Sequence, residues 1–362
     1  MIVGQRVTDR PVWADLPEPT WLRPEEPPAA ATVAVIGGGL MGVATAYWLS
    51  RSGIDTVLLE RDNLGAAASG RNAGLALHNS RPIENPDLVD DVLHDEKIDA
   101  DCRTTGHLAL ASSPQMWERI RAEVTDRPSG APALHALTRK DCEEVIGMRI
   151  SRRYHGGRWL PSGRTLHPVK LVHGLARAAQ EAGARICSGC AVFDVEEQRV
   201  RTSRGTVLAD HVVFAAGAGT ARLLDSVAQF LQPQPREMLA TTPVARSLGP
   251  GMAVDWGTAY WRQCADGTVV LGGAPVEFLG RALPDLPPLA LARRWIGVMD
   301  CTPDDQPVIG RLTRPDQWII AGFCGHGIPG AVGAGRALTD YLVTGTMPAA
   351  LRAFRPDRFL SR

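Results

Sequence analysis

The segment TVAVIGGGLMGVATAYWLSRSGIDTVLLE, residues 32–60, decides the fold. Residues 32–39 have the apolar run of a buried strand that ends in glycines. Residues 41–53 have the pattern of a helix that ends at Gly53. Residues 55–60 are a second apolar strand of the kind found in parallel sheets. The order strand, helix, strand predicts a βαβ unit and an α/β fold.

The glycines between the first strand and the helix form a GxGxxG pattern. Gly37 permits the tight turn, Gly39 lets the main chain approach a pyrophosphate, and Gly42 allows the helix to pack closely on the strand. The helix N-terminus then directs free N–H groups and a positive dipole end at the phosphates. Glu60, at the end of the second strand, is placed to accept hydrogen bonds from ribose hydroxyls, and its charge disfavours a 2′-phosphate. The sequence therefore predicts a dinucleotide site that is not built for NADP.

Composition excludes several classes of protein. The 362-residue chain has 39 basic and 39 acidic side chains, whereas nucleic-acid-binding proteins usually show a basic excess. No apolar run reaches the roughly 18 residues of a membrane span, and the first residues lack the order of a secretory signal, so we expect a cytoplasmic protein. The seven cysteines are expected to be reduced thiols. Cys187 and Cys190 form a CxxC without a second pair for zinc, so no metal site is predicted.

The rest of the chain adds further elements. Residues 1–30 are Pro-rich and predict an extended arm that Trp13 and Trp21 pin to the surface. A helix is predicted over 167–184, and a hairpin across Arg204-Gly205 leads into a strand that ends at Ala216-Gly217. Alternating strands over 226–299 predict antiparallel sheet. A strand over 318–323, a glycine loop over 325–335 and a final helix close the fold.

Residues 61–75, RDNLGAAASGRNAGL, resemble the flavin-site segment of the D-amino-acid oxidase superfamily, which includes glycine oxidase and sarcosine oxidase. Three further motifs follow in family order: GARICSGCAVFDV (183–195), VVFAAGAGT (212–220), and the pair TPDDQPVIGR (302–311) with AGFCGHGIPGAVGAG (321–335). The pattern is most similar to the amine-oxidising branch that includes gamma-glutamylputrescine oxidase. The resemblance implies a Rossmann-like FAD-binding domain and a substrate domain with a mainly antiparallel sheet. The first takes residues 1–80, 162–225 and 300–362, and the second takes 81–161 and 226–299.

The resemblance also assigns cofactor contacts. In the family, the stretch that matches 68–74 wraps the pyrophosphate and the flavin, and the position of Val192 holds the adenine through its main chain. The residues so assigned to FAD, together with the glycine motif, are Gly37, Gly39, Leu40, Met41, Gly42, Glu60, Arg61, Ala68, Ser69, Arg71, Asn72, Ala73, Gly74, Val192, Ala216, Gly217, Gly322, Gly325, Gly327 and Ile328. Gly219 departs from the many relatives that carry Trp. Gly297 stands where relatives with covalent flavin have a Cys, so non-covalent FAD is expected.

The start of the last helix has a role that follows from its main chain. The N–H groups from Gly325 to Ile328 can stabilise the negative charge of a reduced flavin. Some relatives place a Lys just after the GHG motif, but here the residue is Pro329. His326 either lines the flavin edge or only packs the loop.

The substrate side is carried by a predicted strand around residue 261. Strand alternation puts Tyr260 and Arg262 on one face and Trp261 on the other. Arg262 is either an anion-binding residue of the cavity or a solvated edge residue. His78 can also reach the cavity. Met299 stands where amino-acid-oxidising relatives have a carboxylate-binding Arg, so the sequence predicts an amine, or a larger substrate whose anionic group lies elsewhere.

The resulting functional hypothesis is FAD-dependent oxidation of a C–N bond. Hydride transfer to flavin N5 gives an imine that hydrolyses, and oxygen or another acceptor reoxidises the flavin. Two alternatives stay open: oxidation of a C–O bond, as in a 2-hydroxy acid, and a non-catalytic FAD-binding subunit of a larger complex.

Overall fold

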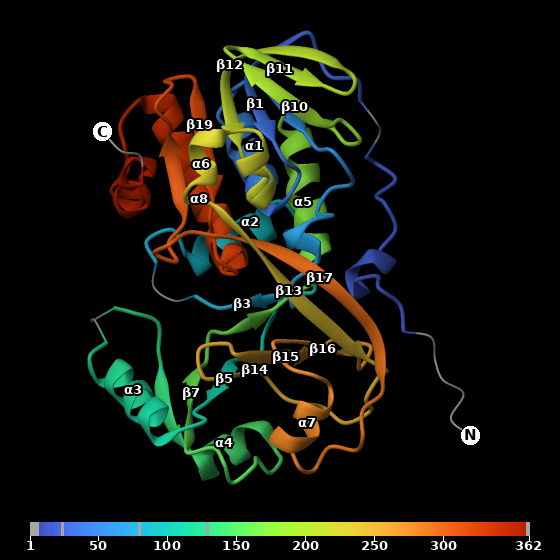
Figure 1. Cartoon of the computed structure of the whole chain (residues 1–362), viewed down its shortest axis with the longest axis vertical. Coiled ribbons are helices and arrows are strands. Elements are labelled where there is room, and N and C mark those ends of the chain that lie inside the picture. The colour runs from blue at the N-terminus through green and yellow to red at the C-terminus, as the bar shows by residue number, and fades with distance from the viewer. Residues whose placement is uncertain (1–6, 23–24, 79–80, 128–129, 360–362) are drawn as a thin grey trace.

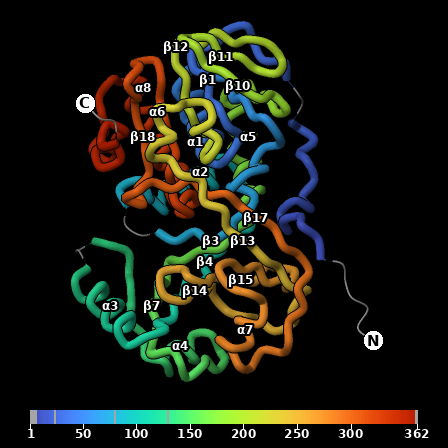
Figure 2. Tube along the Cα trace, in the orientation of Figure 1, coloured from blue at the N-terminus to red at the C-terminus, as the bar shows by residue number. Residues whose placement is uncertain are grey.

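Two large β-sheets form separate lobes, and a long antiparallel pair of strands runs from one lobe to the other (Figure 1). The computed structural model describes residues 7–22, 25–78, 81–127 and 130–359, and every structural statement below concerns these residues. The pair consists of β13 (Gln232–Thr241) and β17 (Leu291–Cys301). Figure 2 shows the chain crossing between the lobes more than once, so neither lobe is one continuous stretch of sequence.

The first sheet contains the predicted βαβ unit. β1 (Ala30–Ile36) pairs in parallel with β2 (Thr56–Leu59), and α1 (Leu40–Arg51) connects them. The helix begins one residue earlier and ends two residues earlier than predicted, because the chain turns at Gly53 with a φ of +75°. The strand order is β10-β11-β12-β1-β2-β9, and β19 joins β12 with β18 beside it. These other strands are β9 (Arg185–Cys187), β10 (Val192–Glu196), β11 (Arg199–Thr202), β12 (Gly205–Phe214), β18 (Val308–Arg311) and β19 (Gln317–Ala321).

The helices α5 (Pro168–Glu181) and α8 (Gly327–Thr344) pack against α1 in the same core. The sequence predicts a glycine loop over 325–335, which is wrong, because α8 already begins at Gly327. A Cβ added to Gly333 would lie 2.2 Å from the carbonyl oxygen of Ile83, and one added to Gly335 would lie 2.9 Å from the carbonyl carbon of Ala44 in α1. The glycines therefore let α8 approach its neighbours closely.

The second sheet has the order β17-β13-β16-β15-β14-β5-β7-β6. Its pairs are antiparallel, as predicted, except that β14 runs parallel to β5. One face packs with α4 and α7 around Trp261, and the other face turns toward loops of the first lobe. The elements are β5 (His107–Leu110), β6 (His135–Thr138), β7 (Gly156–Leu160), β14 (Gly251–Val254), β15 (Ala259–Gln263), β16 (Val269–Gly272), α3 (Pro114–Thr125), α4 (Arg139–Ile146) and α7 (Glu277–Ala282).

Short elements complete the description of the fold. They are β3 (Leu75–Ala76), β4 (Arg103–Thr104), β8 (Arg164–Thr165), α2 (Pro86–Asp95), α6 (Asp225–Ala228), η1 (Val12–Asp15), η2 (Ala68–Gly70), η3 (Gly217–Arg222), η4 (Ala349–Phe354) and η5 (Pro356–Arg358). The small sheet β3-β8-β4 lies where the two lobes meet (Figure 1).

The N-terminal arm is anchored more deeply than a surface arm. It contains the short helix η1, and Trp13 in that helix is buried. The Trp13 Nε1–H donates to the carbonyl oxygen of Asn72 at 2.7 Å, and the ring contacts His167 edge-on at 4.9 Å. Trp21 packs on the core of the first lobe. The arm therefore supports the loop around residue 72, while residues 1–6 and 23–24 lie outside the described residues.

The predicted domain limits remain a prediction, although the packing favours moving one of them. Helix α2 lies in the segment assigned to the substrate domain, yet Val89 and Val92 belong to the core around α1 and α8. The boundary at 299/300 also falls inside β17.

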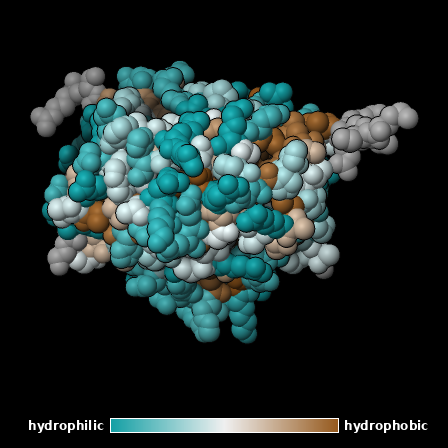
Figure 3. Space-filling model, turned by 90° about the horizontal axis from the view of Figure 1, so that it is seen from below, coloured by the Kyte–Doolittle hydropathy of each residue, from teal (hydrophilic) through white to brown (hydrophobic). Residues whose placement is uncertain are grey.

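The face of the second lobe seen from below is mainly hydrophilic, with small separate apolar patches (Figure 3). Among the described helices, none has the length and apolar character that a membrane crossing requires.

Candidate active site

The glycine turn after β1 is tightly packed at two of its three positions. Gly37 has a φ of +113°, and a Cβ there would lie 2.6 Å from the carbonyl oxygen of Ala215. A Cβ on Gly42 would lie 1.8 Å from the carbonyl oxygen of Gly37, so only glycine permits α1 to start this close to β1. At Gly39 the only heavy atom within 4 Å would be Ser69 Oγ, at 3.1 Å. The turn thus combines close packing with an open side at Gly39.

Glu60 closes the same turn from the end of β2. Its Oε2 accepts the N–H of Gly38 at 2.5 Å, and its Oε1 accepts the N–H of Asp62 at 2.7 Å. Burial raises the pKa of Glu60, and these two N–H donors act in the opposite direction. A carboxylate can accept about four hydrogen bonds, so two acceptor positions remain for ribose hydroxyls. The exposed Arg61 bonds Asp62 at 2.9 Å, and its charge also lowers the pKa of Glu60.

The segment predicted to wrap the pyrophosphate and the flavin lies between the two lobes. Ser69 Oγ accepts the N–H of Leu40 at 2.8 Å, which ties the segment to the start of α1. Asn72 holds the segment in shape, because its Nδ2 donates to Ala68 O at 3.0 Å and its Oδ1 accepts the N–H of Gly74 at 2.8 Å. The segment is therefore rigid at the position where the sequence places the flavin.

Strand β17 holds this segment from the second lobe. Trp295 Nε1–H donates to the carbonyl oxygen of Arg71 at 3.0 Å, and Arg71 Nη1 donates to Ile296 O at 3.1 Å. Gly297 leaves room for Arg71, whose Cβ would lie 3.4 Å from a Cβ added to Gly297. The position where covalent relatives have a Cys is thus in contact with the predicted flavin segment.

Arg262 is a structural tether. The side chain is buried, its Nε donates to Ala73 O at 2.6 Å, and its Nη2 donates to Leu166 O at 2.8 Å. The guanidinium also lies over the Trp13 ring at 5.0 Å. Burial lowers the pKa of Arg262. The solvated-edge alternative is wrong, because Arg262 is buried. Two of its N–H groups already bind main-chain oxygens, and its role as an anion anchor stays a prediction.

One face of the second sheet turns toward the flavin segment. The register β13–β17 places Gln234 opposite Met299, Arg236 opposite Gly297 and Met238 opposite Trp295. On β15, Tyr260 faces the same way, and its hydroxyl donates to Met238 Sδ at 3.2 Å. Trp261 is buried on the opposite face, which confirms the predicted alternation. Met299 and Tyr260 are therefore on a common surface, as expected for two walls of one site.

The start of α8 meets this surface and the start of α1. A Cβ on Gly325 would lie 3.2 Å from Met299 Sδ, and one on Gly327 would lie 3.2 Å from Met41 Cε. Burial lowers the pKa of His326 to about 4, with a smaller contribution from Arg81, so its ring is uncharged at neutral pH. Ile328 is buried in the first turn of the helix.

The remaining predicted contacts border the same region. Ala216 and Gly217 stand where β12 leads into η3, and a Cβ on Gly217 would lie 3.9 Å from Asp300 Oδ2. Val192 begins β10, two residues after Cys190, whose N–H donates to Glu60 O at 2.7 Å. Gly219 has no side chain to fill the place of the Trp of many relatives.

Asp300 is a residue that the motif reading missed. Its Oδ2 accepts the N–H of Gly322 at 2.5 Å. Burial raises its pKa to about 6. No local pattern marks it, because its partners come from segments that are remote in sequence.

The cysteines in the described residues are free thiols. Cys301 is buried, and burial and the neighbouring Cys324 raise its pKa to about 12. His78 is also buried, burial lowers its pKa to about 4, and neither ring nitrogen has a hydrogen-bond partner among the described residues. No group of His, Cys, Asp or Glu in the described part of the chain is arranged to hold a metal.

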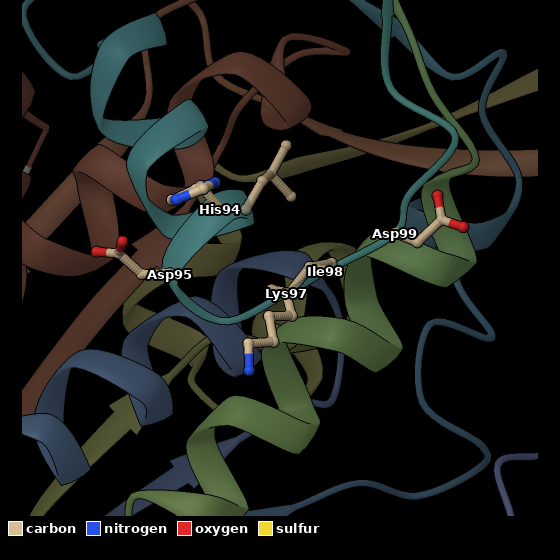
Figure 4. Close-up of a pocket in the computed structure, with 6 residues that line it drawn as sticks. His94, Asp95, Lys97, Ile98 and Asp99 are labelled. Carbon is tan, nitrogen blue, oxygen red and sulfur yellow. The ribbon is translucent and has the colours of Figure 1, made fainter.

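A surface hollow lies at the end of α2, away from these residues. A hollow of about 600 Å³ is lined by Leu93, His94, Asp95, Lys97, Ile98 and Asp99 at the end of α2 (Figure 4). The labelled side chains point in different directions rather than toward a common centre. None of the predicted site residues lines this hollow, so it is not part of the candidate site.

Comparisons with known proteins agree with this geometry. The family model described as FAD dependent oxidoreductase matches residues 32–341. Gamma-glutamylputrescine oxidoreductase of Escherichia coli is 27% identical over 360 residues, covering 86% of this chain and 83% of that protein. Sarcosine oxidase subunit beta of Rhizobium meliloti is 26% identical over 389 residues, covering 94% of this chain and 91% of that protein.

Solved structures support the fold. L-proline dehydrogenase from P. horikoshii superposes with a TM-score of 0.83 at 22% identity, over 92% of this chain and 98% of that chain. Glycine oxidase from Geobacillus kaustophilus has a TM-score of 0.80 at 22% identity, over 92% of this chain and 99% of that chain. Because the match spans most of the chain, the chain belongs to the family of FAD-dependent oxidoreductases, and FAD is its cofactor.

Proposed function

We propose that this enzyme oxidises the C–N bond of an amine or amino-acid-like substrate. The observation that carries the proposal is that three parts of the chain meet: the flavin segment 68–74, the start of α8, and the sheet face that bears Tyr260 and Met299. Relatives named for gamma-glutamylputrescine and sarcosine support a C–N substrate. Bound FAD supplies the acceptor of a hydride from the carbon next to nitrogen, and the resulting imine is hydrolysed by water.

The residues present fit FAD. The open side of Gly39 leaves room for a pyrophosphate against the main chain, and the N-terminus of α1 faces that side. Glu60 keeps acceptor capacity for the ribose. Many of the assigned residues lie inside the molecule yet keep part of their surface accessible, as expected of the lining of a cleft. These include Gly39, Met41, Ser69, Ala216, Gly217, Gly327 and Met299.

The chain's own groups prepare the site electrostatically. The N–H groups at the start of α8 face the region between Met299 and Met41, where they stabilise negative charge. His326 is neutral at pH 7 and adds no positive charge, and Pro329 has no donor. Neither residue therefore adds a positive charge to that of the helix terminus.

The substrate's polar end needs a partner other than Met299. A buried carboxylate without a partner costs several kcal/mol, and Met offers only an apolar, polarisable surface. Arg236 shares the face of Met299 and Tyr260, and within the described part of the chain its side chain donates to Gln234 and Pro235 of its own strand. Arg236 lies opposite Gly297, which is two residues from Met299 on β17. An anion bound by Arg236 would therefore lie roughly 7 Å along the strand from an anion at the position of Met299. We propose an amine, or a substrate whose anionic group lies several bonds from the oxidised carbon.

Steady-state kinetics tests this proposal. kcat/KM is measured for amines, for glycine, sarcosine and small D- and L-amino acids, and for 2-hydroxy acids of similar size. We expect amines, or amines with a remote carboxylate, to be preferred. A tenfold preference for a small amino acid would refute the Met299 argument, since it equals about 1.4 kcal/mol of transition-state binding by the α-carboxylate. A preference for hydroxy acids would replace C–N by C–O oxidation.

A further inference from the structure

Asp300 occupies a junction of three segments. Its side chain starts from β17, its Oδ2 accepts the N–H of Gly322 at 2.5 Å, and its main-chain oxygen accepts the N–H of Cys324 at 3.0 Å. The carboxyl also borders Gly217 at the start of η3. Gly217 and Gly322 are both assigned to the cofactor, so the carboxyl stands against two walls of the FAD site.

Burial is the main cause of the raised pKa of Asp300, and main-chain N–H groups that donate to the carboxyl lower it. Among the described residues, no cation contributes to this pKa. On β17 and the loop before α8, the neighbouring titratable groups are the thiols of Cys301 and Cys324, and burial raises the pKa of both, so they are uncharged at pH 7. From η3, the ionisable residue is Arg222, which is exposed. β13 places Pro233 opposite Asp300, without charge.

His326 in the same loop adds no positive charge near Asp300. Its pKa responds to Arg81 and Asp305 besides burial, and the ring is neutral at pH 7. Asp300 still keeps part of its surface accessible, although protein atoms surround it closely. A ligand that covers the accessible part of Asp300 removes this remaining hydration, which favours the neutral acid.

The charge of FAD also favours the protonated form of Asp300. The pyrophosphate is negatively charged, and a negative charge close to a carboxylate favours protonation.

We propose that Asp300 is a proton-linked positioning residue of the FAD site: its carboxyl binds the loop before α8 and borders the turn after β12, and it takes up a proton when FAD binds beside it. The step is a proton transfer from solvent to an Asp300 oxygen, with no redox change. The inference rests on the FAD site alone, so it stands or falls independently of which substrate is oxidised.

The test is the affinity for FAD as a function of pH, measured by calorimetry on FAD-free protein in buffers with different ionisation heats. For the native protein we expect the Kd for FAD to rise about tenfold between about pH 5.5 and pH 7.5, with proton uptake visible as a buffer-dependent heat. Asp300→Asn keeps an acceptor for the N–H of Gly322 but does not titrate, so its Kd should lose this dependence and its proton uptake.

Asp305→Asn is the matched control. Asp305 is an exposed carboxylate whose charge also acts on Cys301 and Cys324, and its replacement should leave the pH dependence intact. The proposal is overturned if the native protein takes up no proton with FAD, or if Asp300→Asn keeps the native pH profile. If the Asn variant does not fold, Asp300→Ser, which is also polar and does not titrate, replaces it in the same measurement of FAD affinity against pH.

Discussion

Replacing Gly39 by alanine separates cofactor binding from folding. The main chain at Gly39 has φ −78° and ψ 179°, which any residue adopts, and the added methyl would meet only Ser69 Oγ within 4 Å. That atom ends a rotatable side chain, although moving it weakens its bond to the N–H of Leu40. We therefore expect the free energy of unfolding to fall by no more than about 1 kcal/mol.

The same methyl should weaken FAD binding strongly. It would stand where the main chain is predicted to approach the pyrophosphate. Loss of one charge-assisted hydrogen bond costs about 1.5–3 kcal/mol, which is a factor of roughly 10 to 150 in Kd. Gly42→Ala gives the contrast: its Cβ would lie 1.8 Å from Gly37 O, so α1 must move away from β1. Such overpacking costs about 1–3 kcal/mol, and here both stability and FAD binding should fall.

Two measurements decide the matter. Urea unfolding of the FAD-free variants gives the stability, and titration with FAD, followed by its fluorescence, gives the Kd. Native FAD affinity in Gly39→Ala would refute the assignment of the glycine turn to the pyrophosphate. Native stability in Gly42→Ala would refute the packing argument.

Three further predictions concern Asp300, Arg262 and the flavin linkage. The pKa of Asp300 is raised in the folded protein from 3.8 to about 6, so its contribution to stability is present at low pH and is lost as the pH rises through about 6. We therefore compare the free energy of unfolding of the FAD-free native protein with that of Asp300→Asn, both measured in urea. Between pH 4 and pH 7 the difference, native minus variant, should fall by on the order of 3 kcal/mol. If the two proteins show the same change of stability with pH, the prediction is contradicted. Arg262→Ala leaves the oxygens of Ala73 and Leu166 without their donors and should cost about 3–5 kcal/mol of stability, whereas an anion anchor would chiefly change KM. Acid precipitation should leave FAD in the supernatant, because Gly297 offers no thiol and Cys301 lies four residues further along β17, about 13 Å away; yellow protein in the pellet would disprove non-covalent binding and point to Cys301.

The sequence predicts those parts of the fold that depend on local chemistry. The glycine turn, α1 and β2 follow from residue types within about thirty positions, and the structure confirms them. The alternation of Tyr260, Trp261 and Arg262 is equally local, and both faces are as expected. The start of α8 at Gly327 could not be predicted from local residue types. Its glycines act through contacts with Ile83 and Ala44, which only the folded chain brings together.

In the candidate site, too, local features are predictable from the sequence, whereas contacts between remote segments are not. Alternation gives the face of Arg262 but not its partners, which come from residues 73 and 166 and from the Trp13 ring. Asp300 has no motif, and its importance follows from its contact with Gly322 and its closeness to Gly217. Residue types therefore predict which segments bind the cofactor, whereas the buried charges between those segments become visible only in three dimensions.

The central claim, amine oxidation on a flavin bound by this chain, is tested most directly by anaerobic reduction. The purified holoenzyme is mixed without oxygen with each candidate substrate, and the absorbance of the bound flavin is followed. The account predicts that an amine bleaches the flavin within turnover times, and that a 2-hydroxy acid of the same size does not. Bleaching by the hydroxy acid alone, or no bleaching by any substrate in a chain that retains FAD, would contradict it.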